Sequence, residues 1–136
     1  MQKITTFLMF NGNAEEAMKF YTSLFKQSHI ISITRYGKKE AGPEGTVQQA
    51  IFSLKKQEFM CIDSSAKQGF SFTPAMSLFV NCDKEEEIDE LFKKLSTGGK
   101  ILMPLGSYPF SKKYGWITDK FGVSWQLNFA KKGMIE

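Results

Sequence analysis

Apolar and polar positions follow the same pattern twice along the chain. Residues 7–25 (FLMFNGNAEEAMKFYTSLF) align with residues 77–95 (SLFVNCDKEEEIDELFKKL) at an offset of 70. In each copy a short apolar run leads into a polar turn, and apolar residues then recur three and four positions apart. That second spacing places them on one face of a helix. Each copy therefore predicts a strand followed by an amphipathic helix.

Both predicted helices carry a start signal. Asn13 is followed three positions later by Glu16, and Asp83 by Glu86. This spacing is typical of a capping box, in which the two side chains bond to free backbone N–H groups of the first turn. The pair Gly98–Gly99 predicts the end of the second helix.

Short strands follow each helix. We predict them at residues 29–36, 46–54 and 58–63 after the first helix, and at 101–103, 113–119 and 122–129 after the second. The chain is thus predicted to be an α+β protein with two βαβββ modules in a single domain, 1–136. The predicted parts are module one (1–63), a linker (64–74), module two (75–130) and a C-terminal tail (131–136). One helix cannot cover both faces of its sheet, so we expect the modules to pair.

Composition and charge narrow the class of protein. Hydrophobic residues make up 42% of the chain and include 13 Phe, enough for a buried core. The net charge of +4 comes from lysine, since Arg35 is the only arginine, and this disfavours a nucleic-acid partner. Cys61 and Cys82 form no CxxC motif, and no run has the length of a membrane span or the form of a signal peptide. We therefore expect a cytoplasmic protein with reduced thiols and no membrane partner.

The duplicated module resembles the vicinal oxygen chelate superfamily, which includes glyoxalase I, extradiol dioxygenases and the bleomycin- and fosfomycin-resistance proteins. Three segments resemble its PhnB-like branch: FNGNAEEAMKFYTSLF (10–25), GGKILMPLG (98–106) and YGWITDKFGVSWQLN (114–128). The resemblance implies a cupped mixed sheet, a small ligand on its concave side and a homodimer.

The superfamily holds its metal with side chains from the first and last strand of each module. Carried over to this sequence, those positions fall near Thr5, Cys61, Ala75 and Gln126. Thr, Ala and Gln supply neither imidazole nor carboxylate, and a single thiol does not replace them. The single histidine, His29, opens a strand away from all four positions. We therefore expect no metal at the usual site and no cofactor.

Five residues are the candidates for ligand binding in the cleft. They are Gln49, Cys61, Tyr114, Trp116 and Gln126. Each also has an ordinary structural interpretation: the two amides can bond to neighbouring backbone, the aromatic residues can be packing, and Cys61 can be a small buried hydrophobe.

Three further features have expected roles. Residues 103–115 (MPLGSYPFSKKYG) are long for a hairpin connection and read as an aromatic loop, serving as a lid or a dimer contact. Asp63 and Asp119 stand at strand ends, where Asp ordinarily caps a turn.

The leading hypothesis is a PhnB-like protein that binds a small organic molecule without the superfamily's metal. Whether it is an enzyme stays open. One alternative is a lyase or isomerase of glyoxalase type that recruits a metal through Asp63, Glu58 or His29. Another is a non-catalytic dimeric structural module whose cleft is filled by Phe side chains. Some PhnB-like relatives are called ubiquinone-precursor methyltransferases, but neither strand-to-helix turn here carries a glycine-rich nucleotide motif, so we discount methyl transfer.

Overall fold

The computed structural model describes residues 2–130, so the predicted tail, 131–136, lies outside the described part of the chain. The chain forms two compact units, Met1–Gly69 and Phe70–Glu136, with the boundary inside the predicted linker. Each unit holds one four-stranded sheet and one helix. Within the described residues, neither helix has the length and apolar character needed to cross a membrane.

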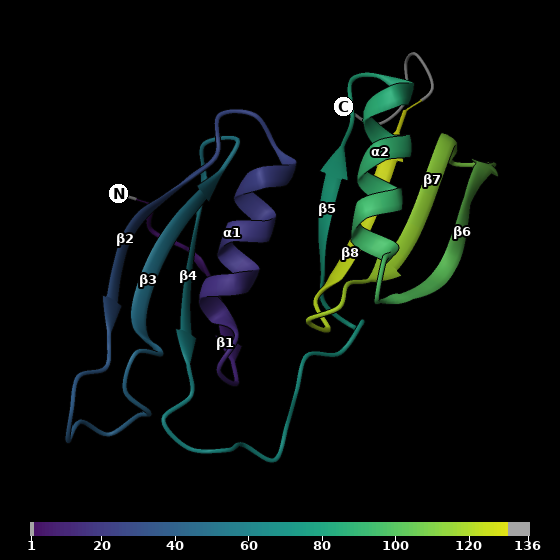
Figure 1. Cartoon of the computed structure of the whole chain (residues 1–136). Helices are drawn as coiled ribbons and strands as arrows, with labels where there is room; N and C mark the ends of the chain where they lie inside the picture. The colour runs from purple at the N-terminus through teal and green to yellow at the C-terminus, as the bar shows by residue number, and fades with distance from the viewer. Residues whose placement is uncertain (1, 131–136) are drawn as a thin grey trace. The chain divides into compact units, whose positions relative to one another are not determined.

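The first unit has the element order predicted for module one (Figure 1). β1 (Thr6–Phe10) leads into α1 (Ala14–Leu24), and β2 (His29–Arg35), β3 (Val47–Leu54) and β4 (Gln57–Asp63) follow. The strand order in the sheet is β1-β4-β3-β2. β1 and β4 are parallel, whereas the β4–β3 and β3–β2 pairs are antiparallel.

The second unit repeats this arrangement. Its elements are β5 (Ser77–Asn81), α2 (Glu85–Ser96), β6 (Lys100–Tyr108), β7 (Ser111–Thr118) and β8 (Ser124–Phe129). The strand order is β5-β8-β7-β6, again with the first and last strands of the module parallel. The predicted α+β class with a duplicated βαβββ module is thereby confirmed.

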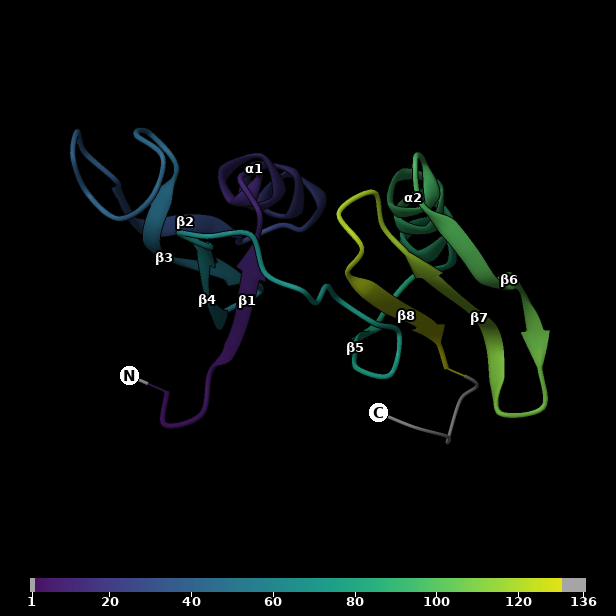
Figure 2. The same ribbon diagram turned by 90° about the horizontal axis from the view of Figure 1, so that it is seen from below.

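In each unit the helix lies against one face of its own sheet (Figure 2). In the first unit the Tyr21 ring of α1 packs 6.3 Å from Phe52 of β3, and Phe52 stacks on its cross-strand partner Phe59 at 5.2 Å. Side chains alternate between the two faces of a strand. Ala50 and Cys61, which are also cross-strand partners, therefore share this helix-covered face.

A glycine lets α2 approach the second sheet closely. A Cβ built on Gly115 of β7 would lie 2.6 Å from the Phe92 ring, so a larger residue there would clash with the helix. Around this contact Ile117, Trp125 and Leu127 are almost fully buried. They form the core of the second unit together with Ile88, Leu91 and Leu95 of α2.

Two aspartates at strand ends fix the turns, as predicted. Asp63 Oδ1 accepts hydrogen bonds from the N–H groups of Gly12 (2.8 Å) and Ala14 (3.0 Å), and Oδ2 accepts one from Val47 N–H (2.8 Å). Asp119 Oδ1 accepts from the N–H groups of Phe121 and Val123 in the β7–β8 turn.

The predicted capping boxes are wrong in detail. Asn13 precedes α1 as expected, but its side chain makes no capping bond, because Asp63 from β4 bonds to the first turn instead. In the second unit the N-cap residue is Lys84, and Asp83 N–H donates to Glu87. A contact between distant segments replaces the local one in α1, which sequence spacing alone does not reveal.

The predicted aromatic loop, residues 103–115, is a hairpin instead. β6 continues to Tyr108 and β7 begins at Ser111, with register shifts between them. Tyr108 and Phe110 stack at 5.6 Å, and both rings contact Tyr114 edge-on at 5.6 and 4.9 Å. This packing holds the aromatic side chains against their own sheet.

Candidate functional site

The sheet face opposite α2 carries most of the predicted site residues. Gly115 and Ile117 face the helix, so alternation puts Tyr114 and Trp116 on the other face. On β8 the same rule puts Gln126 on that face, because its neighbours Trp125 and Leu127 are core residues. We call this surface of the second unit the open face. The structure therefore brings Tyr114, Trp116 and Gln126 together.

Gln126 lies between two aromatic side chains. Its partner on the parallel strand β5 is Phe79, and its partner on the antiparallel strand β7 is Trp116. Phe79 is 48% exposed, and Trp116 and Gln126 are half-buried. Adjacent strands lie about 4.8 Å apart, so both rings flank the amide directly.

The Gln126 amide is held by a tyrosine. Tyr114 donates its hydroxyl proton to Gln126 Oε1 over 2.6 Å, and Tyr114 is only 4% exposed. Burial, followed by the neighbouring Tyr108, raises the pKa of Tyr114 above its usual value of 10.0. The phenol thus remains protonated and keeps its role as a donor.

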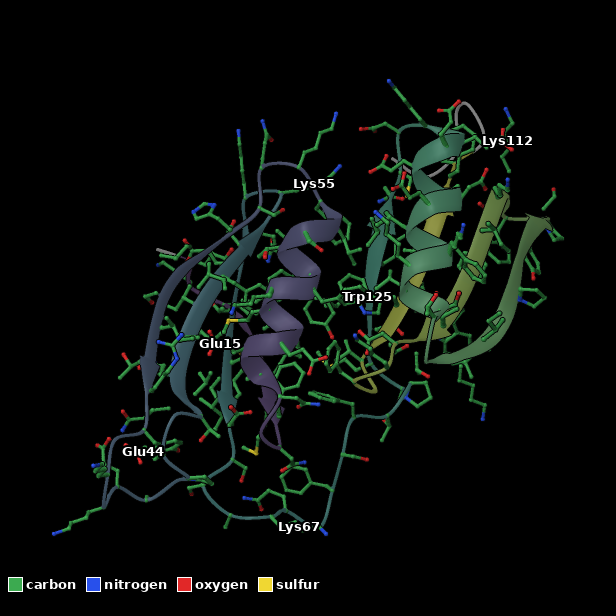
Figure 3. The ribbon with its side chains drawn as sticks, in the orientation of Figure 1. Glu15, Glu44, Lys55, Lys67, Lys112 and Trp125 are labelled. Carbon is green, nitrogen blue, oxygen red and sulfur yellow. The ribbon has the colours of Figure 1, made fainter. Side chains whose placement is uncertain are left out.

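Polar groups beside Gln126 are bonded to one another. Trp116 Nε1 donates to Ser124 Oγ over 2.8 Å, and Ser124 Oγ lies 2.7 Å from Ser77 Oγ. Trp116 consequently presents its ring, not its N–H, to the open face. Trp125 (labelled in Figure 3) is instead 1% exposed and donates its Nε1 proton to Asp119, so it is a core residue.

On the face of the first sheet that points away from α1, the positions contributed by β1 and by most of β4 are apolar. Phe7 pairs with Met60 and Met9 with Ile62, on the side opposite the helix-facing Leu8 and Cys61. Gln49 is exposed on this side, opposite Thr34 of β2. Gln48 is an extra residue in β3 at this point, because Thr34 pairs with Gln49 and Arg35 with Val47.

Cys61 is placed differently from its expected position in the cleft. Its side chain is 0% exposed and faces α1. Burial raises its pKa to about 12, with a smaller contribution from the charge of Asp63. Met9 and Phe79 are equivalent at the offset of 70, and they pair with Ile62 and Gln126. Ile62 is therefore the module-one counterpart of Gln126, and the placement argues against Cys61 as a ligand residue.

The donor set does not fit the superfamily's metal. Thr5, Ile62, Ala75 and Gln126 contain no carboxylate, imidazole or thiolate. Among residues 2–130 no group of three or more His, Cys, Asp or Glu side chains could hold an ion.

The substitute ligands named in the alternative hypothesis do not converge. Asp63 lies at the end of β4 and is committed to three backbone N–H groups, whereas Glu58 lies near the start of the same strand. His29 is exposed on β2, and Ser53 of β3 separates it from Glu58.

Two basic residues of the sheets are paired with their own helices. Arg35 forms a two-pronged ion pair with Glu15 at the start of α1, with distances of 3.1 and 2.7 Å. The hydrogen bond from Arg35 lowers the pKa of Glu15. Lys113 contacts Asp89 and Glu85 of α2 at 2.6 and 3.0 Å.

The first unit also has a hollow of about 360 Å³. It is lined by the β1–α1 turn, Pro43, Thr46, Asp63 and residues 64–68. The carboxylate in it already bonds to Gly12, Ala14 and Val47. The Asp63 carboxylate is thus used for folding.

Sequence reasoning missed Phe79, Ser77 and Ser124 as part of the open face. Strand alternation and the offset of 70 could have identified Phe79. The first and last strands of the module are parallel neighbours, and this pairing brings Phe79 beside Gln126. Ser124 was hidden because a serine after a turn suggests a turn role.

Two βαβββ units, each with one helix against one face of its sheet, define the fold of the vicinal oxygen chelate superfamily. A solved glyoxylase/bleomycin resistance protein/dioxygenase domain from Frankia sp. EAN1pec matches it with a TM-score of 0.68 at 12% identity, covering 98% of this chain and 95% of that one. Within this superfamily, the chain can be assigned to a particular family. The family described as 3-demethylubiquinone-9 3-methyltransferase, to which PhnB-like proteins belong, matches residues 2–128, and the chain belongs to this family.

Two relatives agree with this assignment. A solved PhnB protein from Bacillus cereus, provisionally named for the same methyltransferase, is 67% identical, with a TM-score of 0.93 over 95% of this chain and all of that one (100%). Protein YjdN from Escherichia coli K12 is 22% identical over 143 residues, 95% of this chain and 96% of its own.

Proposed function

We propose that this protein binds a small organic molecule on its uncovered sheet faces, without the metal of the superfamily. The observation that carries the proposal is the residue set at the four metal positions, Thr5, Ile62, Ala75 and Gln126, which lacks charged or strongly basic donors. A small ligand then has to be held by packing and neutral hydrogen bonds.

The surroundings of Gln126 support such a ligand. Small-molecule sites are typically apolar walls with a few placed polar groups. Phe79 and Trp116 supply two aromatic walls on either side of one amide. In the first unit Phe7, Met9 and Ile51 lie on the equivalent side of the sheet and supply further apolar surface, with Gln49 as its amide.

We also expect a homodimer in the cytoplasm. Phe7 on the first sheet is 50% exposed and Phe79 on the second sheet is 48% exposed, and a contiguous exposed apolar patch often marks a protein interface. A second copy would cover this kind of surface. Sizing by light scattering tests the expectation, and a monomer at micromolar concentration would contradict it.

The family's name suggests methyl transfer, and the turn before α1 argues against it here. Nucleotide-like groups commonly bind at the free N–H groups of a helix start. The N–H groups of Gly12 and Ala14 are taken by Asp63. The site for a methyl donor would therefore have to lie elsewhere.

A thermal-shift screen of small organic compounds tests the proposal on four proteins: wild type, Q126A, W116A and Q57A. A ligand that binds the native state raises the melting temperature by mass action. We expect compounds that stabilise wild type and Q57A, whose Gln57 is an exposed residue at the start of β4, but not Q126A or W116A. Compounds that stabilise all four proteins equally would overturn the proposed site.

A further inference from the structure

We infer that Tyr114 fixes the orientation of the Gln126 amide, so that the site accepts ligands with an oxygen acceptor, such as a carbonyl or carboxylate, beside a planar apolar group. This inference rests on the proposed function and names the class of ligand. Tyr114 is a positioning residue in this account, and Gln126 is the group that touches the ligand.

A carboxamide carries an acceptor on one side and a donor on the other. Rotated by half a turn, Gln126 would offer either its oxygen or its NH₂ group to a ligand. Tyr114 donates to Oε1 over 2.6 Å, which turns the oxygen toward the tyrosine. Nε2 then has no partner within residues 2–130, and its two protons are available.

The opposite orientation is disfavoured by the buried phenol. Tyr114 is 4% exposed, and within the described residues its only acceptor is Gln126 Oε1. If the amide turned, the phenol oxygen would accept from Nε2 and the phenol proton would lose its acceptor. An unmade bond at a buried donor disfavours that state by about tenfold.

The neighbouring rings keep Tyr114 in place. Tyr108 and Phe110 contact it edge-on at 5.6 and 4.9 Å. Tyr108 donates its own hydroxyl proton to Pro104 O over 2.7 Å, so it does not compete for Gln126. Phe79 and Trp116 are the cross-strand neighbours of Gln126 and supply aromatic surface for a planar group.

The test uses three probes of similar size: acetophenone (a neutral acceptor), benzoate (an anionic acceptor) and aniline (a neutral donor). Each is titrated into the ¹⁵N-labelled full chain while the side-chain amide signals of Gln126, assigned with Q126A, are followed by NMR. We expect acetophenone or benzoate to shift these signals and to bind about tenfold more tightly than aniline. Binding of both acceptors shows a general oxygen site, and binding of benzoate alone shows a carboxylate site.

Two variants separate positioning from packing. In Y114F the amide is free to turn, and we expect the preference for acceptor over aniline to fall toward one while the ring packing persists. Y108F removes the neighbouring hydroxyl from the same cluster and should leave the preference unchanged. A preference that survives in Y114F overturns the inference.

The remaining outcomes are also decisive. If aniline binds wild type at Gln126 as tightly as acetophenone, the inference fails and the proposed function stands. If none of the three probes shifts a signal from the open face, the inference fails and the proposed function loses its aromatic site.

Discussion

Asp63 and Ala14 are 49 positions apart in sequence, and the Asp63 carboxylate accepts a hydrogen bond from Ala14 N–H over 3.0 Å. The bond ties the end of β4 to the start of α1. The same carboxylate bonds to Gly12 and Val47, so one buried side chain organises the turn, the helix and β3. It also takes the helix start away from any bound phosphate or nucleotide.

Replacing this aspartate should therefore be costly. D63A leaves three backbone N–H groups without their acceptor, and we expect a loss of about 3 kcal/mol in the free energy of unfolding, measured with urea. D83A is the matched control, because Asp83 is exposed, precedes α2 and makes no side-chain cap. It should change stability by less than about 0.5 kcal/mol. Equal losses in the two variants would contradict this role for Asp63.

The contact between Gly115 and Phe92 predicts a second stability effect. In G115A the new methyl group would meet the Phe92 ring at 2.6 Å, and we expect a loss of about 2 kcal/mol. G106A adds the same methyl to β6, where nothing lies within 4 Å, and should be much milder. Adding F92L to G115A should recover part of the loss, and an unchanged deficit would point to another cause.

A substitution in the β3–β4 turn is predicted to increase the stability of the protein. Lys56 has a φ of 73°, a left-handed conformation that costs a non-glycine residue about 1 kcal/mol. K56G removes this cost, but glycine also gives the unfolded chain more entropy, which offsets about 0.5 kcal/mol, so we expect the free energy of unfolding to rise by about 0.5 kcal/mol. A lower midpoint would show that the lysine side chain stabilises the turn.

The buried Cys61 thiol predicts that the stability of the protein depends on pH in the alkaline range. Its pKa is raised from 9.0 to about 12, so the folded protein holds a proton that the unfolded chain loses. The thiol contributes stability that is complete below pH 9 and is lost as the pH rises toward 12. Wild type should therefore lose stability more steeply than C61A over this range. The same thiol should not react with a disulfide reagent at pH 8 until the protein unfolds. A fast reaction with the native protein would contradict its burial.

Local patterns predict much of this fold from the sequence. Both helices and most of the strands lie where spacing and turn residues place them, because an internal repeat supplies the same signal twice. The caps could not be predicted, since Asp63 reaches Ala14 across 49 positions. Residues 103–115 were misjudged because the segment is long for a hairpin connection, whereas the Tyr108–Phe110–Tyr114 packing holds it in an irregular hairpin.

Some features of the candidate site could also be predicted from the sequence, and others could not. Alternation along β7 and β8 could place Tyr114, Trp116 and Gln126 on one face, and these three were among the five candidates proposed from the sequence. The Tyr114–Gln126 bond is a diagonal contact between strands, and its partner cannot be read from spacing. Cys61 was assigned to the wrong face because a shift of one residue reverses every side chain in a strand.

Metal analysis of untagged, freshly purified protein, combined with thermal shift in Zn²⁺, Ni²⁺, Mn²⁺ and Fe²⁺, tests the central claim most directly. Gln126 and its counterparts lack charged or strongly basic donors, so we predict that no metal copurifies in a stoichiometric amount and that none of the four ions raises the melting temperature. A metal that copurifies near stoichiometry, stabilises the fold and is lost in Q126A would contradict the account and return the site to metal chemistry.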